Sequence, residues 1–191
     1  MSKSPYDQFP NIITDEITLR KIIPSDLDSL FEIYSNEKLF LHSPVMLKKN
    51  KDTVANMIGH FERDYNKKKV IFLGISVNSD PENIVGVAEI FDYNREVNMI
   101  TIGYRINDRF WGRGIATKTV KAMVEYLFND IGINRIQAFV MPENTKSLNV
   151  LRRNNFVEEG TVRQGYVWKG KGVVDLVLFS MIKSDYNGNW I

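Results

Sequence analysis

The stretch Tyr104-Arg-Ile-Asn-Asp-Arg-Phe-Trp-Gly-Arg-Gly-Ile-Ala-Thr117 decides how this chain is interpreted. The alternating apolar segment Met99 to Ile106 predicts a β-strand, and the residues from about Ala116 to Phe128 predict a helix. Gly112 and Gly114 lie at the turn between them, where glycine lets a ligand approach the backbone. The free N–H groups at the start of such a helix, and its dipole, favour an anion such as a phosphate. Two glycines alone are more typical of a tight turn without a ligand, so the decision depends on the rest of the chain.

The composition limits the class of protein. With 191 residues and 43% hydrophobic side chains, the chain is long enough for one domain with a core and short for two. There is no cysteine, which excludes disulfides, thiolate nucleophiles and cysteine-based metal sites. The two histidines, His42 and His60, lie far from the glycine loop in the sequence, so we expect no metal site.

Charge and hydropathy exclude two kinds of partner. The formal net charge of +2 and the pI of about 8.7 are not the strong basic excess of a dedicated nucleic-acid binder. No apolar run approaches the length of a membrane span, and the first residues lack the apolar centre of a signal peptide. We therefore expect a cytoplasmic protein that binds neither nucleic acid directly nor a membrane.

Hydrophobic periodicity predicts seven strands and four helices. The strands are expected at residues 16–23, 70–78, 84–93, 99–106, 135–141, 156–167 and 173–182. The helices are expected from residue 24 to about 34, at 52–67, and at about 116–128 and 145–154, with turns at 78–83 and 169–172. This order predicts an α+β fold with a mixed, mostly antiparallel sheet of about seven strands and helices on both faces. We expect a lead-in at residues 1–13, a single domain at 14–185 and a tail at 186–191.

Three sequence blocks carry a resemblance to a known family. The first, Trp111-Gly-Arg-Gly114-Ile-Ala116, matches the loop Gln/Arg-x-x-Gly-x-Gly/Ala of the GNAT superfamily of acetyl-CoA-dependent N-acetyltransferases, with Trp111 replacing the usual Gln or Arg. The second runs from Asn144 through Ser147 to Phe156, with Asn155 replacing the family's glycine. The third consists of Glu159, Gly160, Gly170 and Asp175.

In this order and at these spacings, the blocks resemble the RimJ/RimL branch of the superfamily. The resemblance covers essentially Ile12 to Ser184. It implies a GNAT-type fold, acetyl-CoA as the cosubstrate and no metal.

The resemblance also implies how acetyl-CoA binds. The backbone N–H groups of residues 111–116 suit its pyrophosphate, and Arg113 and Lys118 either add charge there or are solvated. The family's strands diverge beside the loop, so backbone groups around residues 104–106 pair with the pantetheine amides like an added strand. Asn144 reaches the cofactor arm, caps the following helix, or does both. The predicted cofactor-binding residues are Tyr104, Arg105, Ile106, Trp111, Gly112, Arg113, Gly114, Ile115, Ala116, Thr117, Asn144 and Asn149.

Amine acetylation needs an amine that has lost a proton and a thiolate that gains one. Ser147 matches the family serine thought to protonate the leaving sulfur, although a surface serine is an alternative. The family's usual glutamate falls on Thr101, which cannot act as a base, and a second acidic position falls on Tyr166. Glu89 in the neighbouring strand is the best remaining carboxylate, with a solvated strand residue as the alternative. The predicted catalytic residues are therefore Ser147, Glu89 and Tyr166.

Three functions remain open from the sequence. The first is acetylation of a protein N-terminal α-amine, such as that of a ribosomal protein. The second is acetylation of a small amine such as a polyamine, an amino acid or a drug, and the third is a CoA-binding sensor without catalysis. A monomer and a homodimer are both compatible with the sequence, because exposed strand edges allow a dimer.

Overall fold

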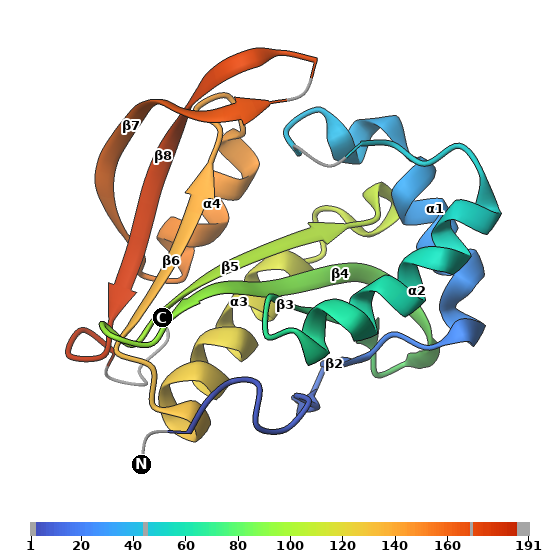
Figure 1. The fold of residues 1–191 in the computed structure, drawn as a ribbon, viewed down its shortest axis with the longest axis horizontal. Coiled ribbons are helices and arrows are strands. Elements are labelled where there is room, and N and C mark those ends of the chain that lie inside the picture. The colour runs from blue at the N-terminus through green and yellow to red at the C-terminus, as the bar shows by residue number, and fades with distance from the viewer. Residues whose placement is uncertain (1–2, 44–45, 169, 187–191) are drawn as a thin grey trace.

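The computed structural model describes residues 3–43, 46–168 and 170–186. Within these residues, eight strands form one sheet in the order β1-β2-β3-β4-β5-β6-β8-β7 (Figure 1). Neighbouring strands are antiparallel except β5 and β6, which are parallel. The strands are β1 Ile12–Ile13, β2 Ile17–Lys21, β3 Val70–Val77, β4 Asp80–Asn94, β5 Met99–Ile106, β6 Arg135–Val140, β7 Val157–Trp168 and β8 Gly172–Ile182. The predicted α+β fold is confirmed, and β1 is the strand that the prediction lacks.

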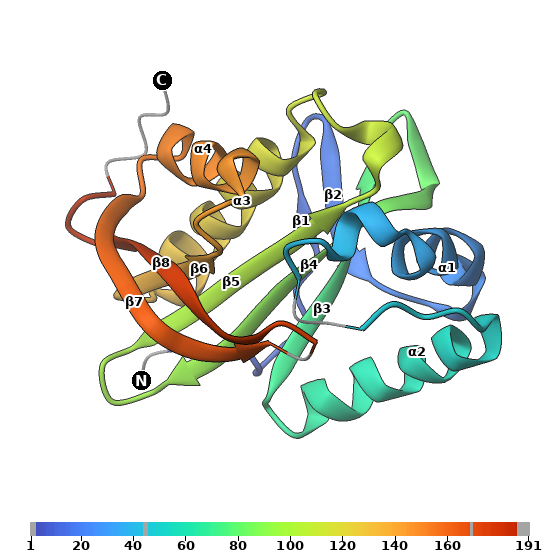
Figure 2. The same ribbon diagram turned by 90° about the horizontal axis from the view of Figure 1, so that it is seen from above.

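Two pairs of helices cover opposite faces of the sheet (Figures 1 and 2). Helices α1 (Leu27–Ser35) and α2 (Lys51–Asn66) lie on one face, and α3 (Ile115–Glu125) and α4 (Thr145–Arg153) on the other. The short helices are η1 (Pro24–Asp26), η2 (Glu37–Phe40), η3 (Asp108–Phe110) and η4 (Tyr126–Ile131), the last a π-helical turn that extends α3. None of the described helices is both long and apolar enough to span a membrane.

Alternation along β4 divides the core between the two faces. Ala88 and Ile90 pack in the cluster that α3 and α4 cover, whereas Val87 packs in the cluster under α1 and α2. Full burial of one large apolar side chain contributes about 1.5–3 kcal/mol, so both helical layers are held mainly by burial. The apolar stripes of α1 and α3 provide Leu30 and Ile33, and Val120 and Met123, all without solvent exposure.

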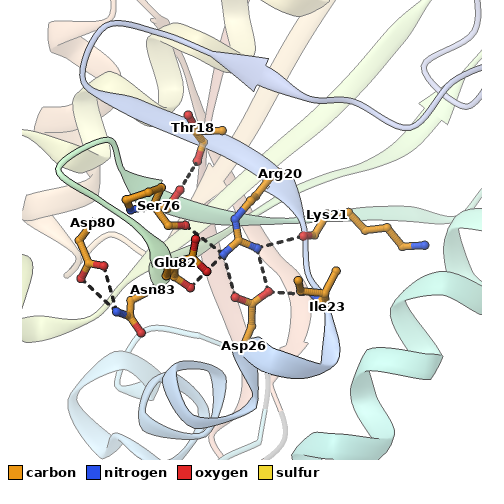
Figure 3. A network of polar contacts seen from close by, with 10 residues as sticks. Thr18, Arg20, Lys21, Ile23, Asp26, Ser76, Asp80, Glu82 and Asn83 are labelled. Atoms are coloured by element: carbon orange, nitrogen blue, oxygen red, sulfur yellow. Dashed lines mark hydrogen bonds and ion pairs between the residues drawn. The ribbon is translucent and has the colours of Figure 1, made fainter.

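Strand β4 begins earlier than predicted. The turn expected over residues 78–83 is confined to residues 78–79, and β4 starts at Asp80. The pairing steps from Ser76↔Ile84 to Val77↔Asp80, so three extra residues of β4 bulge out of the ladder. The Asn83 side chain donates to the Asp80 carboxylate at 3.0 and 3.1 Å, which supports this bulge (Figure 3). The other predicted turn includes Lys169, which lies outside the described residues.

A buried ion pair joins β2, the start of α1 and the β3–β4 connection (Figure 3). The two carboxylate oxygens of Asp26 each accept a hydrogen bond from Arg20 at 2.8 Å, and one also accepts the Ile23 N–H at 2.8 Å. Arg20 additionally donates to the carbonyls of Pro81 and Glu82 at 3.3 Å. The Asp26 side chain has no solvent exposure, and its negative charge is compensated by the Arg20 guanidinium and the Ile23 N–H.

Candidate functional site

The site begins where β5 and β6 separate. In the ladder they share, residues 99–101 pair with residues 135–137, and then β6 continues beside β8 while β5 continues beside β4. The Asn107 N–H donates to the Val85 carbonyl at 2.8 Å, and hydrogen-bonded positions alternate along an antiparallel pair. The backbone groups of Tyr104 and Ile106 therefore face the gap, whereas those of Arg105 face β4.

The start of α3 closes one end of this gap. Gly112 and Gly114 have φ angles of +76° and +74°, a conformation that favours glycine, and Gly114 is the N-cap. No side chain caps the helix, and its first backbone bond runs from the Lys118 N–H to the Gly114 carbonyl at 3.0 Å. The N–H groups of residues 115–117 are thus left without partners inside the helix. This is the anion-binding geometry that the two glycines predict.

A cleft of about 1430 Å³ follows the gap and extends to residues 38–43, which follow α1, and to the β7–β8 hairpin. Its walls bring together the predicted site residues, with the exception of Arg113. The three predicted catalytic residues come from three elements, since Ser147 lies on α4, Glu89 on β4 and Tyr166 on β7. Arg113 places its guanidinium over the ring of Phe110, 5.1 Å from the centroid.

Asn144 and Ser147 are joined at the start of α4. The Asn144 side-chain oxygen accepts the Ser147 N–H at 3.2 Å, so the capping role predicted for Asn144 is present, and both residues line the cleft. Tyr104 lies beside Ser147. Burial raises the pKa of Tyr104 to about 12, and the Ser147 hydroxyl opposes this rise. The Tyr104 hydroxyl is buried and makes no hydrogen bond of regular geometry with a described residue.

Trp111 uses one of the backbone groups expected to bind pantetheine. Its indole N–H donates to the Ile106 carbonyl at 2.8 Å, which ties the loop to the end of β5. The Lys146 ammonium lies 4.1 Å from the Trp111 ring centroid, a cation–π contact with the start of α4. The expectation that the backbone of residues 104–106 is unpaired is therefore wrong at Arg105, which faces β4, and only partly right at Ile106.

The sequence of residues 16–157 matches the family described as the acetyltransferase (GNAT) domain. The chain belongs to the GNAT acetyltransferase family. Among its relatives is the uncharacterized N-acetyltransferase p20 of Bacillus licheniformis, 27% identical over 93% of this chain and 98% of that protein. The [ribosomal protein uS5]-alanine N-acetyltransferase of Escherichia coli is 23% identical over 78% of this chain and 79% of its own length. Mycobacterium smegmatis RimJ, solved in complex with CoA-disulfide, shares the fold with a TM-score of 0.81 at 22% identity, covering 90% of this chain and 84% of that one.

A GNAT acetyltransferase takes its acetyl group from acetyl-CoA, and the cleft of this GNAT domain fits that donor. A Cβ at Gly112 would meet no described atom within 4 Å, so there is room against the loop backbone. The uncapped N–H groups of α3 suit a pyrophosphate, and the open edge of β5 at Tyr104 suits an amide of the pantetheine arm. The buried, unpaired Tyr104 hydroxyl lies farther along the same cleft.

The cations expected near the phosphates have other partners in the GNAT domain. Lys118 forms an ion pair with Glu16, which lies in the turn before β2. Arg113 lies over Phe110, as described above. In this arrangement, the backbone donors at the α3 N-terminus provide the positive potential of the loop.

Glu89 has a cationic partner, which the sequence analysis does not anticipate. Its Oε1 lies 2.6 Å from Nη2 of Arg105, and the two side chains are 16% and 9% exposed. Glu89 is therefore neither an isolated buried carboxylate nor a fully solvated strand residue. The Arg105 side chain lies with Glu89 on the face of the sheet that α1 and α2 cover.

Two aromatic residues that the sequence analysis missed hold Arg105. Nη1 of Arg105 donates to the Tyr34 hydroxyl at 2.5 Å, and its guanidinium lies 5.1 and 5.8 Å from the ring centroids of Tyr34 and Phe40. Burial raises the pKa of Tyr34 to about 12, although the charge of Arg105 opposes the rise. No local motif marks these contacts, because α1, η2 and β5 meet only in the folded chain.

The acceptor end of the GNAT cleft lies between η2 and the β7–β8 hairpin. Lys171 at the hairpin tip donates to the Leu41 carbonyl at 2.7 Å, so the two segments touch. An apolar wall is formed by Phe91, Phe139, Val162, Tyr166, Trp168 and Leu176. The acidic residues among the described lining are Glu89, Asp92 and Glu143, and the basic ones are Lys38, Arg105, Lys146 and Arg153.

Proposed function

We propose that this GNAT acetyltransferase acetylates a protein N-terminal α-amine. The observation that supports this acceptor is the composition of the acceptor end, which combines a long apolar wall with few carboxylates, of which Glu89 is held in an ion pair. An apolar wall suits the side chains of a peptide, and the Glu89 carboxylate suits one ammonium group. A polyamine carries several positive charges and would need an excess of acidic side chains, which the described lining lacks.

The relatives support the same acceptor class. One of them is, by its name, an alanine N-acetyltransferase that acts on a ribosomal protein, and its match covers more than three quarters of both chains. We extend that acceptor class to this chain as part of the proposal. The single-domain division, the cytoplasmic location and the choice between monomer and homodimer stay predictions.

We assign the donor to the residues around the gap. The N–H groups of residues 112–117 hold the pyrophosphate, with Trp111 and Asn149 at the edges of the cleft. Tyr104 and the free side of Ile106 hold the pantetheine arm, and Asn144 reaches the same arm while it caps α4. Bound acetyl-CoA supplies the acetyl group: the amine nitrogen bonds to the thioester carbon, the C–S bond breaks, and an amide and a thiol result.

Ser147 and Glu89 then have distinct tasks. Glu89 binds the acceptor ammonium, and Tyr166 offers a further hydrogen bond from the hairpin. An α-amine has a pKa near 8, so roughly a tenth of it is neutral at pH 7 and solvent can remove its proton. Ser147 donates its hydroxyl proton to the leaving sulfur and regains a proton from solvent, while the acylated nitrogen loses its second proton to solvent.

The acceptor is tested by thiol release from acetyl-CoA with three kinds of amine. Peptides that begin with Ala or Ser should turn over. The same peptides with a blocked N-terminus and an internal lysine should not, and neither should spermidine. Faster turnover of spermidine than of any free peptide would overturn the proposed acceptor in favour of a small amine.

The serine is tested separately. Ser147→Ala should lower kcat by about 100-fold or more, the usual size of general acid catalysis, without changing the affinity for acetyl-CoA. Ser25→Ala, an exposed serine far from the cleft, is the matched control and should be fully active. An unchanged kcat in Ser147→Ala would remove this residue from the mechanism.

A further inference from the structure

One of the two Glu89 carboxylate oxygens faces the cleft, and the other faces Arg105. Oε1 of Glu89 is buried against Arg105, with less than 1 Å² of exposed surface. The exposed part of the side chain therefore includes Oε2, and no described residue donates a hydrogen bond to it. Gly103 lies opposite Glu89 on β5, and a Cβ there would lie 3.7 Å from Oε2. The glycine leaves the space beside this oxygen open to a ligand.

The other half of the ion pair is immobilised by packing. The Arg105 side chain is 9% exposed and is held by the Tyr34 hydroxyl, the Tyr34 and Phe40 rings, and Glu89. Burial alone would lower the pKa of Arg105, but the charge of Glu89 and the Tyr34 hydroxyl outweigh it and raise the pKa above its ordinary value. A permanently charged, planar group in fixed surroundings can orient a carboxylate, as a flexible lysine cannot.

We propose that Arg105 is a positioning residue, which fixes the Glu89 carboxylate so that its Oε2 receives the acceptor ammonium. This inference rests on the proposed function, because it assumes that an amine binds at Glu89. The register of β4 against β5 makes the arrangement possible. Glu89 pairs with Gly103, and Arg105 lies two residues farther along β5 on the same face of the sheet, next to Glu89 on the diagonal.

The arrangement also explains how the site works with Thr101 in place of the family's glutamate. Thr101 is buried, and its hydroxyl accepts a hydrogen bond from Gln137 at 3.1 Å. Glu89 supplies a carboxylate from the neighbouring strand, two residue pairs away, since Phe91 rather than Glu89 pairs with Thr101. The displaced carboxylate needs a partner to hold it, and Arg105 is that partner.

Other charged and titratable groups share the cleft with Glu89. Arg105 on β5 pairs with it directly, and Tyr34 on α1 contacts Arg105. Among the other lining residues are Lys38 and His42 near η2, Asp92 on β4 and Tyr166 on β7. Lys38 is itself paired with Asp108 at 2.8 Å, so its charge is partly compensated.

The experiment compares Arg105→Met, Arg105→Lys and the control Arg109→Met. Arg109 also pairs with a glutamate, Glu32 at 3.0 Å, but its side chain is 72% exposed and lies outside the cleft. Each variant is titrated with acetyl-CoA and assayed with an Ala-starting peptide between pH 6 and 9. Arg105→Met should lower kcat/KM for the peptide by about 100-fold, the cost of a misplaced binding group, with unchanged affinity for acetyl-CoA.

The split between KM and kcat separates positioning from a purely structural role. In Arg105→Met the loss should fall on KM for the peptide, with kcat little changed, because a Glu89 carboxylate that is no longer held in place binds the acceptor ammonium less well. Arg105→Lys should recover only part of kcat/KM, and Arg109→Met should match the wild type. A wild-type kcat/KM in Arg105→Met would overturn the inference, as would an equal loss in Arg109→Met.

Two further variants keep the test decisive. If Arg105→Met does not fold, Tyr34→Phe removes only the hydroxyl that holds Arg105, and it should lower kcat/KM without changing acetyl-CoA affinity; a wild-type value would overturn the inference. Glu89→Gln separates the two proposals. If Glu89→Gln is fully active, the assigned role of Glu89 in the proposed function fails. If Glu89→Gln is impaired and the Arg105 variants are not, only the positioning role fails.

Discussion

Two arginine–carboxylate pairs hold opposite ends of α1, and they differ in which partner is accessible. In the Arg20–Asp26 pair the carboxylate has no exposure and the arginine is 21% exposed, whereas in the Arg105–Glu89 pair the arginine is 9% exposed and the carboxylate 16%. Asp26 uses both oxygens within the protein. Glu89 keeps one oxygen for the cleft.

An arginine–carboxylate pair can thus either stabilise the fold or support a ligand-binding carboxylate. A carboxylate whose acceptor positions are all used within the protein stabilises the fold, because any change exposes an uncompensated charge. A carboxylate with an open position in a cleft is available to a ligand, and its arginine then acts as the support. We therefore expect changes at Asp26 to be seen in stability and changes at Glu89 to be seen in activity.

The largest effect should come from breaking the enclosed pair. Asp26→Ala should lower the free energy of unfolding by about 3–5 kcal/mol, because it removes the enclosed carboxylate that pairs with Arg20 and accepts the Ile23 N–H. Urea denaturation followed by circular dichroism measures this loss. Asp28→Ala, two residues away and paired with Lys51 at an exposed site, is the control and should cost far less. Equal losses in the two variants would mean that enclosure does not matter.

The next effect should be on catalysis. Glu89→Gln keeps the shape of the side chain but removes its charge, so kcat/KM for an N-terminal peptide should fall by about 100-fold. The free energy of unfolding should fall by less than in Asp26→Ala, since the glutamine oxygen still accepts a hydrogen bond and the Tyr34 hydroxyl still binds Arg105. Peptide kinetics and urea denaturation of the same preparation measure both. A stability loss as large as that of Asp26→Ala would erase the distinction between the pairs.

A third, more exposed pair, Arg135–Glu159, should make a smaller and pH-dependent contribution to the free energy of unfolding. Arg135 binds Glu159 through two hydrogen bonds of 2.6 and 2.7 Å, and with Ser180 it lowers the pKa of Glu159 from 4.5 to about 2. A carboxyl whose pKa is lowered by folding stabilises the protein above the unfolded pKa and loses that contribution as the pH falls. The Glu159 side chain is 36% exposed, so screening should limit the contribution to about 0.2–1 kcal/mol.

The measurement is the urea midpoint of the wild type and of Glu159→Gln at pH 6 and at pH 3. The wild type should be the more stable at pH 6, and the difference should shrink at pH 3, between the two pKa values of Glu159. A difference that grows on acidification would contradict the sign of this linkage.

The smallest effect should come from the fully solvated pair Lys21–Glu62, which is 2.7 Å long with both side chains more than half exposed. Glu62→Gln should leave the urea midpoint and the activity at wild-type values, because solvent and salt screen such a pair. A clear loss of stability would show that distance, rather than enclosure, sets the value of an ion pair in this protein.

The fold could be predicted where the pattern is local. The strand before Gly112, the helix after Gly114 and the capping of α4 by Asn144 each depend on residues within a few positions of one another. The start of β4 could not be predicted, because Asp80–Asn83 reads as a turn and extends the strand only through its bulge beside β3. The two-residue β1 is too short to show periodicity.

The candidate site divides in the same way. The donor loop and Ser147 are recognisable from sequence, since their spacing is short and fixed. The pairing of Glu89 with Arg105 depends on the register of two strands, and that of Lys118 with Glu16 joins residues 102 positions apart. Tyr34 and Phe40 reach Arg105 from yet other elements. A side-chain role that depends on contacts between distant segments cannot be inferred from the spacing of residues in the sequence.

The short parallel ladder between β5 and β6 has a consequence for how the protein opens. Three residue pairs connect β1–β5 with the unit of β6, β8 and β7 in this sheet. Amide hydrogen exchange should therefore detect separation of that unit at a lower free energy than global unfolding. A donor lying along the edge of β5 and against α4 spans this junction, so binding it should slow exchange in both parts together. The proposed donor would therefore help to hold the two parts of the sheet together.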